Sequence, residues 1–196
     1  MNGLSLDPGL LRLAYARGYF PMPHPDTGEI LWFSPDPRAI IPLGGFHCSR
    51  SLARTLRLGA FEISMDRDFA GVMAGCAERT ETWITDEFKT AYGRLHAEGD
   101  AHSLEVWQED KLVGGVYGVA LGRAFFAESM FHRVTDASKV ALYHLVERLR
   151  QQDMLLLEVQ FLTSHLASLG AVEIPREQYL RRLAAALKTT SRFVCS

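Results

Sequence analysis

The sequence predicts an α+β fold in which helices flank a mostly antiparallel central sheet. Residues 103–131 contain three β-rich runs separated by short turns, which is the pattern of an antiparallel meander. A long helical pattern follows over residues 137–152, and a nearly continuous apolar run over residues 154–161. Strands that precede a mixture of helices and further strands favour a single sheet packed against helices.

The chain is expected to divide into a small, reduced N-terminal lobe at residues 1–46 and a main domain at residues 47–196. A helix is predicted over residues 7–17, because Asp7 can cap its start and Pro8 suits its first turn. The short stretch before this helix indicates that the lobe is reduced in size.

The remainder of the first half alternates between short strands and helices. Residues 19–29 hold three prolines and a glycine, which predicts a loop. Ser49 can cap a helix over residues 50–57. On that helix Arg50, Arg54 and Arg57 share one face. Short strands are predicted at residues 30–33, 40–43 and 61–66.

Helices and strands in the second half follow clear periodic patterns. Trp83 lies in a short segment between two helices, and Thr135 or Asp136 can cap the long helix. Strands are predicted at residues 103–108, 112–121, 123–131 and 154–161. Helices are predicted at residues 68–79, 86–98, 137–152, 163–170 and 176–188.

The apolar strand at residues 154–161 is expected to be buried on both faces in the middle of the sheet. Glu158 and Gln160 are two residues apart, so strand geometry places both on one face, opposite Leu157 and Val159. Polar groups in so apolar a run are costly to bury without partners. The residues alone leave open whether the two are structural or functional.

Composition places the chain among ordinary globular proteins. It has 196 residues, 47% of them hydrophobic, and a net charge of −2. A protein that coats RNA is usually basic, so any RNA contact must be a local patch. No run approaches the ~18 apolar residues that span a bilayer. The three cysteines, Cys48, Cys76 and Cys195, are odd in number and lack CxxC spacing, which favours thiols in a reducing cytoplasm.

The familiar motifs of phosphate binding, serine hydrolysis and zinc proteolysis are absent from the sequence. No cluster of His, Cys and acidic residues has metal-ligand spacing, so no metal is expected. The order of elements is similar to the N-acetyltransferase fold, in which a glycine-rich turn before a helix holds the coenzyme A pyrophosphate. The matching turn at residues 132–139 has no glycine and carries Asp136, which would repel a pyrophosphate.

Several strings, in this order and spacing, resemble the leucyl/phenylalanyl-tRNA–protein transferase family over residues 10–183. They are WFSPDPRA (32–39), TWIT (82–85), HSLEVW (102–107), LVGGVYGVALG (112–122), ESMF (128–131), ASK (137–139), LEVQFLTSHLASLGA (157–171) and EIPR (173–176). The resemblance implies an N-acetyltransferase-like catalytic domain that needs no cofactor.

The implied reaction moves Leu or Phe, and less well Met, from Leu-tRNA or Phe-tRNA to an acceptor protein with N-terminal Arg or Lys. This transfer marks the acceptor for N-end-rule degradation, and we expect the enzyme to be a monomer. Two alternatives remain open at this point. One is an acyl-coenzyme A-dependent N-acyltransferase, and the other is a catalytically inactive module that binds tRNA or N-degrons.

The resemblance also implies the roles of particular residues. Glu158 and Gln160 would be catalytic and would handle the acceptor amine, although the family has Asp where this chain has Glu158. The additional methylene moves the carboxylate by roughly 1.5 Å. The substrate-binding residues would be Trp83, Glu128, Ser129, Met130, Val116, Leu142, Leu145, Leu149 and Leu157.

Within this set, Trp83 would contact the terminal adenosine of the tRNA and Glu128 the α-amino group of the donor. The apolar residues would form the pocket for the Leu or Phe side chain, although Leu142, Leu145 and Leu149 on one helix face are equally typical of core packing. Arg50, Arg54 and Arg57 would bind the tRNA acceptor stem. A second family aromatic is replaced here by Met22.

Overall fold

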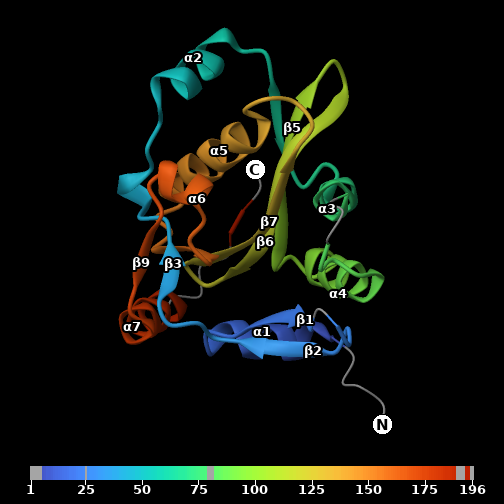
Figure 1. Cartoon of the computed structure of the whole chain (residues 1–196), viewed down its shortest axis with the longest axis vertical. Helices are drawn as coiled ribbons and strands as arrows, with labels where there is room; N and C mark the ends of the chain where they lie inside the picture. The colour runs from blue at the N-terminus through green and yellow to red at the C-terminus, as the bar shows by residue number, and fades with distance from the viewer. Residues whose placement is uncertain (1–5, 25, 79–81, 189–192, 195–196) are drawn as a thin grey trace.

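A seven-stranded sheet runs through the protein in the order β4-β5-β6-β7-β8-β3-β9 (Figure 1). The computed structural model describes residues 6–24, 26–78, 82–188 and 193–194. Neighbouring strands are antiparallel except β7 and β8, which run parallel. The α+β class with a mostly antiparallel sheet is therefore confirmed. The strands are β3 (Arg38–Ile40), β4 (Glu62–Met65), β5 (Ala101–Gln108), β6 (Lys111–Leu121), β7 (Ala124–His132), β8 (Leu156–Gln160) and β9 (Val172–Ile174).

The predicted meander is the central part of this sheet. Strands β5 and β6 are joined by Glu109 and Asp110, whose φ angles of 48° and 59° suit a tight hairpin. Strands β6 and β7 are joined at Gly122 and Arg123. All five residues of β8 are buried, as expected for a strand in the middle of a sheet.

Helices cover both faces of the sheet, and each face has its own hydrophobic core. One core contains residues of α1 (Pro8–Ala16), α3 (Phe69–Ala77), α4 (Asp86–Ala97) and α7 (Arg176–Leu187). The other contains residues of α2 (Arg50–Leu58), α5 (Ala137–Gln151) and α6 (Ser164–Ser168). A single 3₁₀ turn, η1 (Leu43–Gly45), follows β3. Among the described residues, no helix combines the length and apolar character that crossing a membrane requires.

Helix starts follow the predicted capping residues in two of three cases. Asp7 accepts a hydrogen bond from the Leu10 N–H group and Ser49 accepts one from Leu52, so both side chains cap their helices. Asp136 occupies the capping position of α5, but its carboxylate makes no capping hydrogen bond. It pairs instead with Lys139 at 2.8 Å, one turn further along.

The predicted loop at residues 19–29 is partly wrong, because β1 (Phe20–Pro23) pairs with β2 (Ile30–Phe33). The two prolines of β1 are spaced by two residues, so their missing N–H groups lie on the same edge of the strand. The other edge keeps its donors, which is the arrangement that tolerates proline in a two-stranded ribbon. This hairpin lies beside α1 at one end of the molecule (Figure 1).

Two short strands of the large sheet also differ from the prediction. β3 begins at Arg38 rather than residue 40 and ends at Ile40, so part of the expected N-terminal lobe belongs to the large sheet. β9 was not predicted, because three residues at a sheet edge carry almost no periodic signal. The domain boundary at residue 46 stays a prediction.

Candidate functional site

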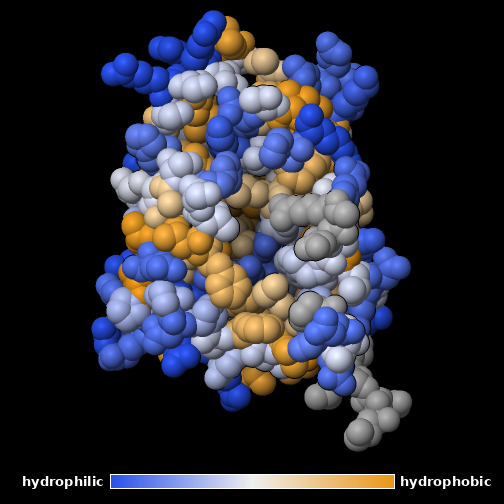
Figure 2. Space-filling model, in the orientation of Figure 1, coloured by the Kyte–Doolittle hydropathy of each residue, from blue (hydrophilic) through white to orange (hydrophobic). Residues whose placement is uncertain are grey.

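A pocket of about 430 Å³ opens where β7 and β8 separate. The two strands pair only from Ala124 to Phe126 and from Leu156 to Glu158, and beyond these residues they diverge. Figure 2 shows a hollow in the middle of this face, with hydrophobic side chains around it and hydrophilic ones deeper inside. The residues that line the pocket are Trp83, Val116, Ala127, Glu128, Ser129, Met130, Leu142, Val159, Gln160, Phe161, Thr163, His165 and Leu166.

Seven of the eleven predicted catalytic and substrate-binding residues line this pocket, and four do not. Those in the lining are Trp83, Val116, Glu128, Ser129, Met130, Leu142 and Gln160. Leu145, Leu149 and Leu157 are fully buried in the core beneath it. Glu158 is also outside the lining and has no exposed surface. The pocket is therefore continuous with the core, and these three leucines belong to the core and not to the pocket lining.

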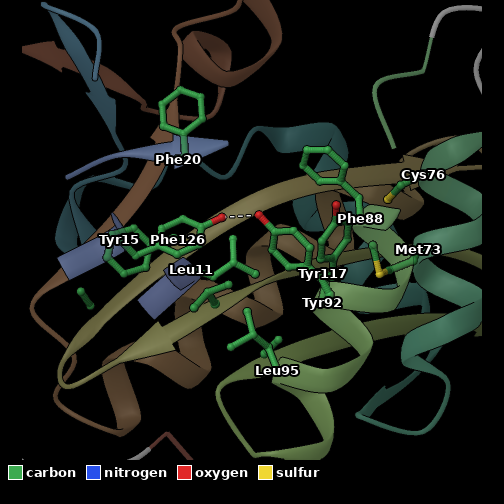
Figure 3. Packing of buried hydrophobic residues seen from close by; sticks show 14 of the residues in the cluster. Leu11, Tyr15, Phe20, Met73, Cys76, Phe88, Tyr92, Leu95, Tyr117 and Phe126 are labelled. Atoms are coloured by element: carbon green, nitrogen blue, oxygen red, sulfur yellow. Dashed lines mark hydrogen bonds between the residues drawn. The ribbon is translucent and has the colours of Figure 1, made fainter. Parts of the chain in front are cut away.

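Glu128 is the only acidic residue in the described lining, and two tyrosines hold its carboxylate. Tyr15 on α1 donates a hydrogen bond of 2.6 Å to Glu128 Oε1, and Tyr92 on α4 donates one of 3.3 Å to Oε2. The two hydroxyl groups also lie within hydrogen-bond distance of each other, and Figure 3 shows them meeting among packed apolar side chains. Two helices that are far apart in the sequence, α1 and α4, thus position the Glu128 carboxyl group.

Burial raises the pKa of Glu128 to about 8. Loss of water disfavours the charged form, and the nearby Glu158 carboxylate adds repulsion. Hydrogen bonds from Tyr15 and Tyr92, together with the Gln160 side chain, lower the pKa and only partly offset this rise. The pocket thus contains a carboxyl group that changes charge near neutral pH, a property typical of functional sites.

Glu158 lies behind the pocket lining and pairs with Arg38, a residue that is completely buried. Arg38 Nε donates to Glu158 Oε1 at 2.7 Å, and Arg38 Nη1 donates to the Gly18 carbonyl at 2.9 Å. The guanidinium lies over the rings of Phe20 and Tyr179, at 4.7 Å and 4.5 Å from their centroids. Burial raises the pKa of Glu158, and the charge of Arg38 opposes that rise.

The regular strand alternation along β8 ends at Val159, before Gln160, although Glu158 and Gln160 both still influence the Glu128 carboxyl group. Gln160 has a φ of 64°, and the Phe161 N–H group donates to the Val159 carbonyl at 2.8 Å. This is a γ-turn, and it brings Val159, Gln160 and Phe161 into the lining together. Simple strand periodicity cannot anticipate such a turn.

The basic face of α2 is open to solvent and does not line the pocket. Arg50, Arg54 and Arg57 are all exposed and are absent from the pocket lining. α2 contacts the start of α5 through Thr55, whose hydroxyl lies 3.3 Å from an oxygen of Asp136.

Sequence reasoning missed Arg38, Tyr15 and Tyr92. Their partners are 36 to 120 residues away in the chain, so no local pattern in the sequence pairs them with Glu128 or Glu158.

Within the described residues, no group of three His, Cys, Asp or Glu could hold a metal ion. Cys48 is half-buried and Cys76 is buried, whereas Cys195 lies outside the described residues.

The chain is similar to known proteins over nearly its whole length. Residues 40–184 match the family model described as leucyl/phenylalanyl-tRNA protein transferase, and residues 5–36 match the N-terminal domain of the same family. Proteins named leucyl/phenylalanyl-tRNA–protein transferase from Ruegeria pomeroyi and Roseobacter denitrificans are 57% and 55% identical, over 97% of this chain and 91% of each relative. The one from Cereibacter sphaeroides is 56% identical, over 98% of this chain and 91% of its own.

Similarity to solved structures is much weaker. A ribosomal-protein-alanine N-acetyltransferase from Brucella melitensis is 20% identical with a TM-score of 0.38, over 48% of this chain and 74% of that one. The L-PGS protein from Bacillus licheniformis is 13% identical with a TM-score of 0.45, over 80% of this chain and 54% of that one.

Proposed function

Because the chain belongs to the leucyl/phenylalanyl-tRNA–protein transferase family, we propose that it moves Leu or Phe, and less readily Met, from aminoacyl-tRNA to the N-terminal Arg or Lys of an acceptor protein. Membership confirms the resemblance found in the sequence and makes the chain an aminoacyltransferase whose partners are an aminoacyl-tRNA and a protein. In the N-end rule, the added residue marks the acceptor for degradation. Charged tRNA is a cytoplasmic molecule, so the proposed reaction takes place in the cytoplasm. The proposed enzyme acts as a monomer.

The observation that carries the proposal is an apolar pocket with one carboxyl group, that of Glu128, among its described lining residues. Val116, Met130 and Leu142 offer a surface suited to a bulky uncharged side chain, and Glu128 lies beside them. One methylene more or less in such a pocket changes binding by only ~1–3 kcal/mol. Acceptance of Leu, Phe and some Met by the same pocket follows.

Glu128 is the residue that we assign to the α-amino group of the donor. Its pKa of about 8 keeps most of the carboxyl neutral at pH 7 in the free protein. An ammonium group within about 4–6 Å favours the ionised form, so binding of the donor and ionisation of Glu128 support each other. Ser129 lies next to it in the lining and can contact the same end of the donor.

The transfer forms one bond and breaks one. The α-nitrogen of the acceptor attacks the ester carbonyl carbon, an amide C–N bond forms, and the C–O bond to the ribose breaks. The nitrogen gives up a proton and the departing ribose oxygen gains one. The acceptor amine has a reference pKa near 8, so it must first lose its ammonium proton.

Gln160 is the group placed to orient the incoming amine, because its side chain lines the pocket near Glu128. An amide oxygen can accept a hydrogen bond from the amine without binding a proton itself. The resemblance implied that Glu158 handles the acceptor amine. Its burial against Arg38 instead favours an indirect part in the reaction. The ribose 2′-hydroxyl of the donor can then relay the proton to the leaving oxygen.

Aromatic side chains in the pocket lining and basic side chains outside it suit the RNA. Trp83 and Phe161 both line the pocket and offer ring faces, and base stacking on such a face is worth ~1–3 kcal/mol. Arg50, Arg54 and Arg57 would contact phosphates of the acceptor stem, which adds affinity without reading sequence.

Transfer of label tests the proposal directly. The protein is incubated with radiolabelled Leu-tRNA or Phe-tRNA and with two acceptor proteins that differ only in an N-terminal Arg or Ala. We expect label in the Arg acceptor only, and a charged RNA hairpin should replace the full-length tRNA. Stable tRNA binding without transfer would indicate the inactive binding module. Turnover of acetyl-coenzyme A without transfer would indicate the other alternative.

A further inference from the structure

We propose that Arg38 is a positioning residue for the transfer reaction, which acts on Gln160 through Glu158. The inference rests on the proposed function of the pocket. Arg38 itself does not line the pocket, and neither does Glu158. The geometry nevertheless joins both to the turn at Gln160, which forms part of the pocket wall.

Arg38 is held more completely than a surface ion pair would be. Its side chain has no exposed surface, its guanidinium is enclosed between the Phe20 and Tyr179 rings, and it donates to both Glu158 and the Gly18 carbonyl. Arginine is suited to this place because its planar guanidinium can stack and donate in fixed directions at the same time. The position of the Glu158 carboxylate is therefore fixed from behind.

Glu158 passes this constraint to Gln160. Its Oε1 atom, which accepts from Arg38, also accepts from the Gln160 N–H group at 2.5 Å. That N–H belongs to a residue with a φ of 64°, at the centre of a γ-turn between Val159 and Phe161. Residues other than glycine rarely adopt this conformation, and it persists only where the surroundings enforce it.

The Gln160 conformation matters because of its location. An extended Gln160 would continue the alternation of β8 and change which side chains face the pocket. The γ-turn instead presents Val159, Gln160 and Phe161 to it. Loss of the Arg38 anchor should therefore leave the fold intact at low temperature while the Gln160 side chain loses its fixed position.

The test combines Arg38→Lys with Gln160→Ala. Lysine keeps the positive charge but loses the Nε donor and the stacked plane. We expect kcat to fall about tenfold or more while KM for aminoacyl-tRNA stays within about threefold, because displacement of a reacting group affects the rate more than binding. In the Gln160→Ala background, Arg38→Lys should cause almost no further loss, since residues that act as one unit are not additive.

Arg176→Lys is the matched control, because Arg176 also joins distant segments but is exposed and bonds to the Ser34 carbonyl. All rates are measured at a temperature where circular dichroism shows each variant folded. Unchanged kcat in Arg38→Lys, or equal fold losses in both backgrounds, would overturn the proposal. If Arg38→Lys does not fold, Tyr179→Leu removes one stacking ring and should give a smaller loss with the same dependence on Gln160.

A measurement without substrate separates this proposal from the assigned activity. Amide hydrogen exchange of Gln160 should be slow in the wild type and should accelerate about tenfold or more in Arg38→Lys, with little change at Leu157. Faster exchange in a protein that transfers nothing would uphold the link from Arg38 to the Gln160 conformation and reject the proposed function. Unchanged Gln160 exchange in Arg38→Lys, together with normal transfer by the wild type, would reject the positioning role and support the proposed function.

Discussion

Tyr15 donates a hydrogen bond of 2.6 Å to Glu128, a residue 113 positions further along the chain. The bond joins the first helix to the strand that forms one wall of the pocket. Tyr15 is fully buried, so the N-terminal helix supports the site directly and does not merely cover it. The charge of Glu128 then becomes the property on which several measurable effects depend.

Stability should fall as pH rises from about 5 to 8, because of Glu128. Its pKa is about 8 in the folded protein and 4.5 for the ordinary group, so the folded state binds an extra proton across this interval. The stabilising effect is complete below pH 4.5 and is lost as pH passes 8, with an upper bound of about 5 kcal/mol. Urea unfolding at several pH values should show that the free energy of unfolding of Glu128→Gln falls less than that of the wild type between about pH 5 and 8. Parallel curves for the two proteins would contradict this assignment.

Tyr15→Phe should shift the pH dependence of kcat/KM towards higher pH. The Tyr15 hydroxyl lowers the pKa of Glu128, so its removal raises that pKa, and ionisation to hold the donor ammonium then needs a more alkaline solution. A hydrogen bond worth about 1 kcal/mol corresponds to somewhat less than one pH unit.

Tyr179→Phe is the control for this shift, because the buried Tyr179 hydroxyl has no hydrogen-bond partner among the described residues. Its profile should keep the wild-type midpoint. An equal displacement in both variants would mean that loss of a hydroxyl acts through general loosening and not through Glu128.

Leu142 and Leu145 lie three residues apart on α5 and should respond differently to truncation. Leu142 lines the pocket, whereas Leu145 is buried in the core beneath it. Both Leu→Ala changes should lower stability by about 2–5 kcal/mol. Only Leu142→Ala should alter the ratio of kcat/KM for Phe-tRNA to that for Leu-tRNA. A changed ratio in Leu145→Ala would show that the side-chain pocket extends deeper than the structure indicates.

Phe161 should contribute to donor binding through its exposed ring. It is 46% exposed although it lines the pocket, and it rests edge-on against Phe20. Phe161→Ala should raise KM for aminoacyl-tRNA by the equivalent of ~1–3 kcal/mol, and Phe161→Tyr should restore it. Leu155→Ala, which removes a comparably exposed apolar side chain outside the pocket, should leave KM unchanged.

The elements predicted well from the sequence are those with local signals. Asp7 and Ser49 cap helices where their side chains indicated, and the meander follows from strand periodicity and turns. Three residues of β9 carry no comparable period, so pairing with β3 alone makes them a strand. The proline-rich β1 looked like a loop because the alternate spacing of its prolines matters only once β2 is known.

The site was predicted in composition but not in geometry. Seven of the expected residues meet in one pocket, and the resemblance to a family was enough to name them. The γ-turn at Gln160 donates a backbone hydrogen bond to Glu158. Glu158 in turn accepts a hydrogen bond from Arg38, which lies 120 residues earlier in the chain. A buried ion pair of this kind is a tertiary property, because each partner would be prohibitively costly to bury alone.

Salt dependence can test whether α2 contacts the tRNA. Arg50, Arg54 and Arg57 are exposed on this helix, and the Ser49 cap and Leu52 hold its other side in place. Each phosphate contact on a DNA duplex contributes roughly 0.9 to the slope of log K against log salt, and we take the same value for the paired acceptor stem. Changing all three to Ala should weaken Leu-tRNA and Phe-tRNA binding equally and make this slope shallower by up to about 2.7. Arg181→Ala with Arg182→Ala, which removes two exposed arginines of α7, should change neither quantity. If the α2 variant keeps the wild-type slope, the acceptor stem must lie against another surface.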